Sequence, residues 1–178
     1  MKTVNAVGWM AGVLLVMPVL ALAAETNGVR IGVYDSRSIA VAFAGTAGFK
    51  ADLERLKKDH EQALARGDRK RAAELAAEGE AWQRRMHQQG FGTAPVTEML
   101  RSIASQMPGI ASNAHVSVFI SVWDTNTLAR YPSAQRVDVT MALVDALHPN
   151  AQQRKWAIEA QKHPPVAQKE LDCMDVRE

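Results

Sequence analysis

The sequence predicts an α+β fold in which a small β body carries a projecting antiparallel helical hairpin. The evidence for the hairpin is a charged stretch, residues 47–89, with a Gly-containing turn at residues 66–68. On both sides of this turn, apolar or small residues recur every three or four positions, which is typical of amphipathic helices that pack on each other. The evidence for the β body is a set of short, β-branched runs before and after this stretch.

The two arms of the predicted hairpin each carry a heptad seam. The seam of the first arm is Phe49, Leu53, Leu56, His60 and Ala63, and that of the second is Ala72, Leu75, Gly79, Trp82 and Met86. The intervening positions are mostly charged or Gln, so the pattern predicts a short coiled coil closed by a tight turn. Asp68 is the expected N-cap of the second arm. Because the second seam is rich in small residues, the tip is expected to be the least stable part.

The remaining elements follow from periodicity and capping residues. Residues 29–35 read as a strand, 115–123 as the best strand in the chain, and 127–131 as a second strand after a turn. A helix is predicted over residues 94–107, and a last domain helix begins near Thr140, with Asp138 or Thr140 as its cap.

The N-terminus has the features of a secretory signal peptide, predicted over residues 1–23. Lys2 precedes an apolar run, and Ala21-Leu22-Ala23 forms an A-x-A cleavage site. The alternative is an uncleaved anchor, because the apolar run is just long enough to span a bilayer. The domain then covers residues 24–149. Residues 150–178 form a polar C-terminal tail, with a short helix near 152–161 anchored by Trp156 and Ile158 and a mobile remainder.

Composition limits the classes of function. The 178 residues carry a formal net charge of +2, which does not favour nucleic acid as a partner. Cys173 is the only cysteine, so no internal disulfide can form.

No motif predicts catalysis, a metal site or a cofactor. Asp35, Asp124 and Asp138 stand at predicted ends of strands or starts of helices. We therefore expect each of them to act as a cap, which requires only one carboxylate oxygen that accepts a hydrogen bond from a backbone N–H. The histidines lack ligand spacing, and the serines lack a nucleophile motif. His60 lies on the seam of the first arm, where simple packing is one interpretation. The alternative is that a partly buried His60 becomes protonated at acid pH and loosens the seam.

Two groups of residues are candidate contact sites. Trp82, Met86 and Phe91 form an apolar group that either contacts an unfolded client or packs where the arms enter the body. The cationic residues are candidates for contacts with anionic lipid or client, the alternative being a solvated face with local ion pairs. They are Lys57, Lys58, Arg84 and Arg85.

The order of elements resembles the Skp/OmpH family of periplasmic chaperones. The resemblance is carried by residues 31–35, 118–124 and 128–131, and by Val137-Asp138-Val139-Thr140, which is similar to the family's Asp-[Ile/Val]-Thr opening of its terminal helix. It covers about residues 29–147. It implies a homotrimer that holds unfolded outer-membrane proteins without ATP. In this chain the arms are shorter than the family's, and the return arm is broken at residues 90–92.

Together with the signal peptide, the resemblance therefore implies a non-enzymatic, ATP-independent periplasmic holdase for unfolded outer-membrane or envelope proteins. The first alternative is a structural or assembly subunit of the cell envelope that binds one dedicated partner. The second is an envelope hydrolase, which depends only on the isolated aspartates and serines.

Overall fold

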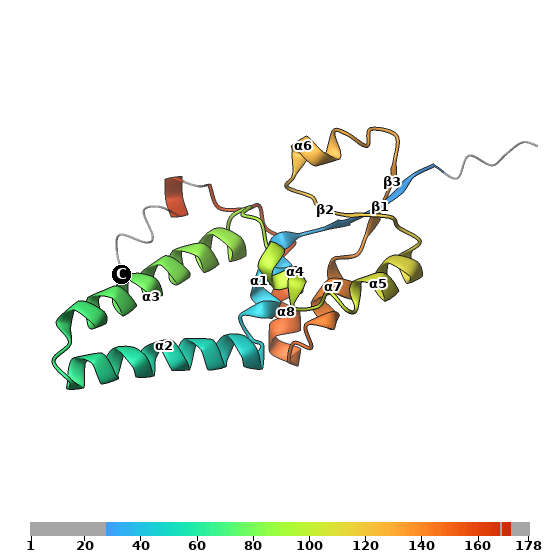
Figure 1. Ribbon diagram of the computed structural model, residues 1–178. Coiled ribbons are helices and arrows are strands. Elements are labelled where there is room, and N and C mark those ends of the chain that lie inside the picture. The colour runs from blue at the N-terminus through green and yellow to red at the C-terminus, as the bar shows by residue number, and fades with distance from the viewer. Residues whose placement is uncertain (1–27, 168, 172–178) are drawn as a thin grey trace, which may run out of the picture.

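The computed structural model describes residues 28–167 and 169–171 (Figure 1). The predicted signal peptide, residues 1–23, lies outside the described residues. In chain order the elements are β1 (Arg30–Tyr34), α1 (Ser36–Phe43), α2 (Ala47–Ala65), α3 (Arg69–Gly90), α4 (Thr97–Arg101), α5 (Met107–Ala114), β2 (Phe119–Ser121), α6 (Thr125–Leu128), β3 (Gln135–Asp138), α7 (Thr140–Ala146) and α8 (Ala151–Ala160). Within the described residues, no helix combines the length and apolarity needed to cross a membrane.

The sheet is small and entirely parallel. Its strand order is β2-β1-β3, with Gly32 paired to Phe119 on one side and to Val137 on the other. Parallel neighbours need long crossover connections, and the segment from α1 to α5 supplies the crossover between β1 and β2. The carboxyl ends of the three strands therefore meet at one edge, next to the start of α1.

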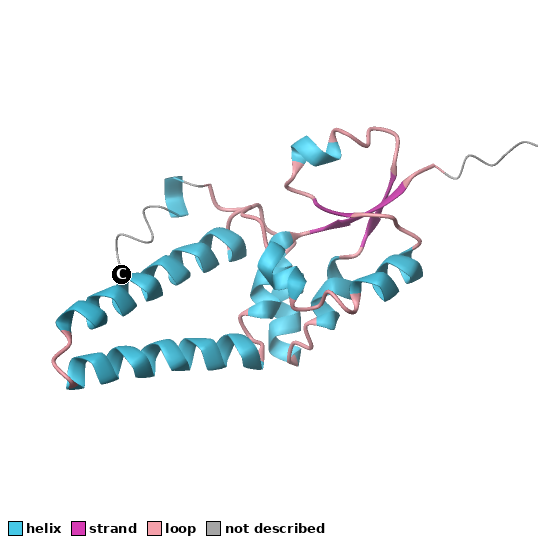
Figure 2. Ribbon diagram, in the orientation of Figure 1, coloured by secondary structure: helices cyan, strands magenta, loops and turns pink. Residues whose placement is uncertain are grey.

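The predicted fold class, a β body with a projecting antiparallel helical hairpin of Skp/OmpH type, is wrong. Helices make up most of the described residues, and the strands form only the three-stranded parallel sheet (Figure 2). A β-branched run indicates a strand, but it does not report how many partners the strand has or in which direction they run. Helices α2 and α3 extend from a body that is mostly helical.

Several predicted strands and helices have different bounds. Only Phe119–Ser121 of the predicted strand 115–123 is a strand, and Thr125–Leu128, in place of a second strand, is a short helix capped by Asp124. The predicted helix 94–107 is split, because α4 ends at Arg101 and α5 begins at Met107 with a proline in its first turn. Proline is compatible with that position because its missing N–H would have no partner within the helix.

The main core lies between one face of the sheet and the helices. Helix α1, including Ile39, is buried nearly throughout, and Leu143, Val144 and Ala157 are fully buried around it. On the other face, Ile31 and Val33 pack with Ile120 and Leu128.

Helix α8 belongs to this core. Its Ala157 is fully buried, and the Ser38 hydroxyl donates to the Ala157 carbonyl at 2.7 Å. Trp156 and Ile158, the predicted anchors, are 55% and 37% exposed. The sequence of α8 does not indicate that the helix belongs to the core, because its buried positions are occupied by the small residue Ala157 and the polar residue Gln153.

The side chain of Gln153 closes the contact between α8 and the loop after α1. It forms a capping box with Asn150, and a Cβ at Gly45 would overlap its amide group. We therefore expect Gly45→Ala to lower the free energy of unfolding by about 1–2 kcal/mol, because Gln153 must move and the cap is lost. Urea denaturation measures this. The control is Gly48→Ala, where a Cβ meets nothing within 4 Å and which should stabilise α2. Equal stability of Gly45→Ala and the unmodified chain would contradict the expectation.

Candidate functional site

An apolar cleft lies between α2 and α3, the two long helices. The helices pack most closely near their connecting turn, where Ala63, Ala72 and Leu75 are buried. Toward the body their ribbons lie further apart (Figure 1). This part holds a cleft of about 450 Å³ whose lining is mostly apolar. The lining residues are Phe49, Leu53, Leu56, Lys57, His60, Leu75, Ala76, Gly79, Trp82, Gln83 and Met86.

Aromatic rings form the end of the cleft nearest the body. The Phe49 ring lies 5.0 Å from the Trp82 ring and 5.7 Å from the edge-on ring of Phe43, measured between centroids. These spacings are those of favourable aromatic pairs. Trp82 therefore packs on Phe49, as one of the two alternatives expected, and it also lines the cleft.

The small residues of the second seam determine the width of the cleft. Gly79 and Ala76 leave space opposite Leu56, whose Cδ2 lies 3.7 Å from the position of a Cβ at residue 79. A volume of this size is within the range of small-ligand sites, and a mainly apolar lining suits apolar side chains.

The opposite side of the same helix pair is polar. Its cleft shares Leu56, Leu75 and Trp82 with the apolar one, but most of its remaining lining is charged. The charged residues are Asp52, Arg55, Asp59, Arg71, Glu78 and Arg85. Only one side of the pair thus offers a continuous apolar surface.

The structure separates the three predicted client-contact residues. Trp82 and Met86 line the apolar cleft, whereas Phe91 lies beyond the end of α3 and outside it. The Phe91 ring lies 5.8 Å from His87 and is 47% exposed, and its carbonyl accepts from the Val166 backbone N–H. Because α3 ends at Gly90, the heptad periodicity of the helix does not extend to Phe91 and cannot predict the direction of its side chain.

The four predicted cationic residues do not form one site. Lys57 lines the apolar cleft and pairs with Glu54 at 3.2 Å, and Arg85 lines the polar cleft. Arg84 pairs with Glu80 at 3.9 Å, and Lys58 is exposed. These local pairs are of the kind expected for a solvated helix face.

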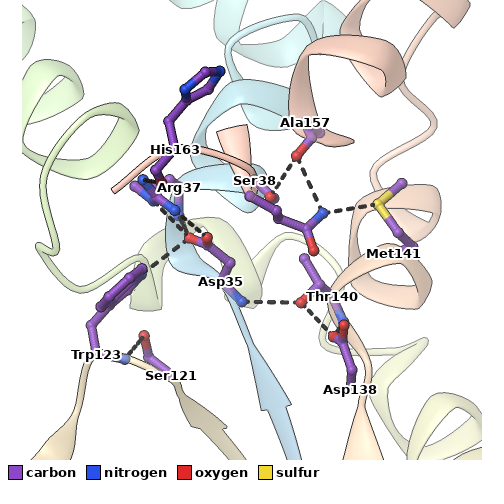
Figure 3. A network of polar contacts seen from close by, with 11 residues as sticks. Asp35, Arg37, Ser38, Ser121, Trp123, Asp138, Thr140, Met141, Ala157 and His163 are labelled. Carbon is purple, nitrogen blue, oxygen red and sulfur yellow. Dashed lines mark hydrogen bonds and ion pairs between the residues drawn. The ribbon is translucent and has the colours of Figure 1, made fainter. Parts of the chain in front are cut away.

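A polar network occupies the carboxyl edge of the sheet (Figure 3). Asp35, the residue after β1, caps α1 by accepting from the Arg37 backbone N–H, and its carboxylate also accepts from the Arg37 guanidinium at 3.1 and 2.6 Å. The Trp123 indole N–H donates to the same carboxylate at 3.1 Å, and the Arg37 guanidinium lies 4.9 Å from the Trp123 ring. Arg37 also donates to the His163 carbonyl.

A second branch of the network joins β1 to β3. The Asp35 backbone N–H donates to the Thr140 hydroxyl, which donates in turn to Asp138 at 2.6 Å. The Thr140 backbone N–H also donates to Asp138. The network therefore ties the ends of the strands to α1, α7 and the segment after α8.

Two of the three aspartates singled out from the sequence cap helices. Asp35 and Asp124 are helix N-caps, as the sequence predicted, and hydrogen bonds from Thr127 lower the pKa of Asp124. Burial, together with the charge of Asp124, raises the pKa of Tyr34 above its ordinary value. Among the described residues, no three His, Cys, Asp or Glu side chains are placed to hold a metal ion. His60 lines the apolar cleft.

The comparisons with known proteins give no match. No family model matches the chain, and neither the curated proteins nor the solved structures contain a match to it. The function is therefore proposed from the geometry of the α2–α3 cleft together with the sequence.

Proposed function

We propose that this protein is a non-enzymatic holdase that binds apolar segments of unfolded envelope proteins in the α2–α3 cleft, without ATP. The single observation that supports this proposal is the open apolar cleft between two helices whose outer faces are charged. Such a surface offers many adaptable contacts and no fixed polar specificity group, which suits varied unfolded clients.

The proposal includes action in the periplasm and assembly as a homotrimer. The apolar N-terminal run with its A-x-A site supports export. The trimer is proposed only from the resemblance of the sequence to the Skp/OmpH chaperones, whose expected fold class the structure does not share. Light scattering behind a sizing column measures the mass of the protein in solution. A monomer would contradict the trimer, but it would not contradict client binding in the cleft, which is tested separately.

The test of the proposed function is suppression of aggregation for several unrelated β-barrel proteins diluted from denaturant. A holdase suppresses aggregation of all of them at stoichiometric concentration and in the absence of ATP. Protection of a single protein among them would favour a subunit with one dedicated partner. Protection of none would contradict the proposal.

Gly79→Leu separates binding from stability. The new side chain extends into the cleft, so we expect affinity for an unfolded client to fall by at least about tenfold. The free energy of unfolding should rise by about 0.5–1 kcal/mol, because glycine is a poor helix former. Fluorescence titration with a labelled client and thermal unfolding measure the two effects.

The matched control for this variant is Ala77→Leu. Ala77 is an exposed residue of the same helix, two positions away, and it lines neither cleft. We expect it to leave affinity unchanged. Equal affinity of Gly79→Leu and the unmodified chain would exclude the apolar cleft as the binding site.

A further inference from the structure

The connecting turn of the helix pair carries a concentrated positive charge. Residues 64–73 contain the four cations Arg66, Arg69, Lys70 and Arg71 and one carboxylate, Asp68, for a net charge of +3. Figure 1 places this turn at the end of the molecule furthest from the sheet. We call residues 64–73 the tip.

Most of the cations of the tip have no acidic partner. Arg71 pairs with Glu74 at 3.2 Å. Within residues 28–167 and 169–171, no ion pair involves Arg66, Arg69 or Lys70, and all three side chains are exposed. Asp68 is occupied as the N-cap of α3, since its carboxylate accepts from the Arg71 backbone N–H.

The position of these cations is unfavourable for the helix itself. Arg69, Lys70 and Arg71 open α3, and its first turn contains no acidic residue. The N-terminal end of a helix carries a partial positive charge, so cations there reduce its stability. Among the described residues, Arg69 and Lys70 have no compensating ion pair, and a local preference that is violated in this way indicates a functional constraint.

An exposed apolar residue lies beside the cations. Leu64 is 56% exposed in the last turn of α2, although its neighbour Ala63 is fully buried against α3. Gly67 has a φ of 72° and allows the chain to reverse tightly there. The packed seam and the tight turn hold Leu64 and the cations together at the end of the pair.

We propose that the tip docks on a membrane surface rich in anionic phosphate headgroups. The cations contact the phosphates, and Leu64 enters the boundary between headgroups and acyl chains, as apolar residues of interfacial helices do. A nucleic-acid site would favour aromatic residues among the cations, and the tip contains none. This site is separate from the α2–α3 cleft, so it can be tested independently of client binding.

The experiment is co-sedimentation of the full chain with vesicles. One set of vesicles is phosphatidylcholine alone, and the other contains about a third phosphatidylglycerol. The apolar run at residues 6–24 can contribute to binding of both sets, so the measured quantity is the ratio of the two partition coefficients. Reversal of three tip charges, Arg66→Glu, Arg69→Glu and Lys70→Glu together, should lower this ratio by at least about 100-fold.

The matched control reverses three charges of α2 and α3 that lie outside the tip. Lys58→Glu, Arg84→Glu and Arg85→Glu change the net charge by the same amount and should leave the ratio within about threefold of the unmodified chain. Leu64→Ser should lower the affinity for anionic vesicles by about fivefold. The tip variant should fold, because Arg69→Glu and Lys70→Glu favour the first turn of α3 and offset Arg66→Glu, which is unfavourable at the C-cap of α2. Its thermal midpoint should therefore stay close to that of the unmodified chain.

Three results would overturn the proposal. The first is an equal loss for the tip variant and the control, which would indicate diffuse attraction. The second is no preference of the unmodified chain for anionic vesicles. The third is full displacement by inorganic pyrophosphate at matched phosphate concentration with no effect of Leu64→Ser, which would indicate a site for soluble phosphate.

Discussion

Asp35→Ala is expected to lower the free energy of unfolding by about 3–5 kcal/mol, the largest effect of any single substitution considered for this protein. The Asp35 and Arg37 side chains are 8% and 4% exposed and are joined at 2.6 Å. Removing the carboxylate leaves the Arg37 charge buried without an anionic partner. It also removes the N-cap of α1 and the acceptor of the Trp123 indole. Denaturation in urea, followed by circular dichroism, measures the loss.

The double variant Asp35→Ala/Arg37→Met is the control for this prediction. It replaces both charges, so no uncompensated charge stays buried, and we expect it to be more stable than Asp35→Ala alone. If the single and double variants have the same stability, the ion pair does not account for the effect, and the capping role of Asp35 accounts for most of it.

Trp82→Ala is expected to weaken client binding by about 30-fold or more. A tryptophan in a cleft, held by a neighbouring ring, is the type of residue that dominates binding energy, with losses of about 2 kcal/mol or more on truncation. Because Trp82 also packs on Phe49, with 5.0 Å between the ring centroids, we expect a smaller loss of about 1–2 kcal/mol in the free energy of unfolding. Client titration and urea denaturation of the same variant separate the two.

Trp156→Ala is the matched control, because Trp156 is 55% exposed on α8 and does not line the cleft. It should leave client binding unchanged. A Trp82→Ala variant that is destabilised but binds clients normally would show that Trp82 only packs the base of the helix pair. A variant of unchanged stability that binds weakly would show the reverse, a contact residue with no packing role.

The positions of the candidate site residues were predictable in part. All but three of the residues that line the apolar cleft belong to the two heptad seams, because periodicity determines which side of a helix faces its neighbour. The seams alone imply close packing along their whole length. The opening between the helices depends on how their ends attach to α1 and the rest of the body, and this is not a property of either seam.

In the polar network, too, the local contacts were predictable from the sequence and the long-range contacts were not. Asp35 was identifiable as a cap because an aspartate followed by serine and arginine at the end of a strand is a local signal. Its hydrogen bond from Trp123 joins residues 88 positions apart. No local pattern contains such a contact, since it depends on β1 and β2 lying side by side in a parallel sheet.

The strand errors have a related cause. Residues 127–131 have the composition of a strand, but Thr125–Leu128 is helical and Leu128 covers the sheet next to Ile31. Composition reports that a segment is apolar and partly buried, which short helices and strands share.

By itself, the sequence determined the two long amphipathic helices, the turn between them, and the caps at Asp35, Asp68 and Asp124, since each depends on residues within a few positions of one another. Only the tertiary structure decided that the strands are parallel, that α8 completes the core, and that α2 and α3 enclose an apolar cleft. These features are contacts between segments far apart in the chain, and their energies depend on the packing of the whole domain.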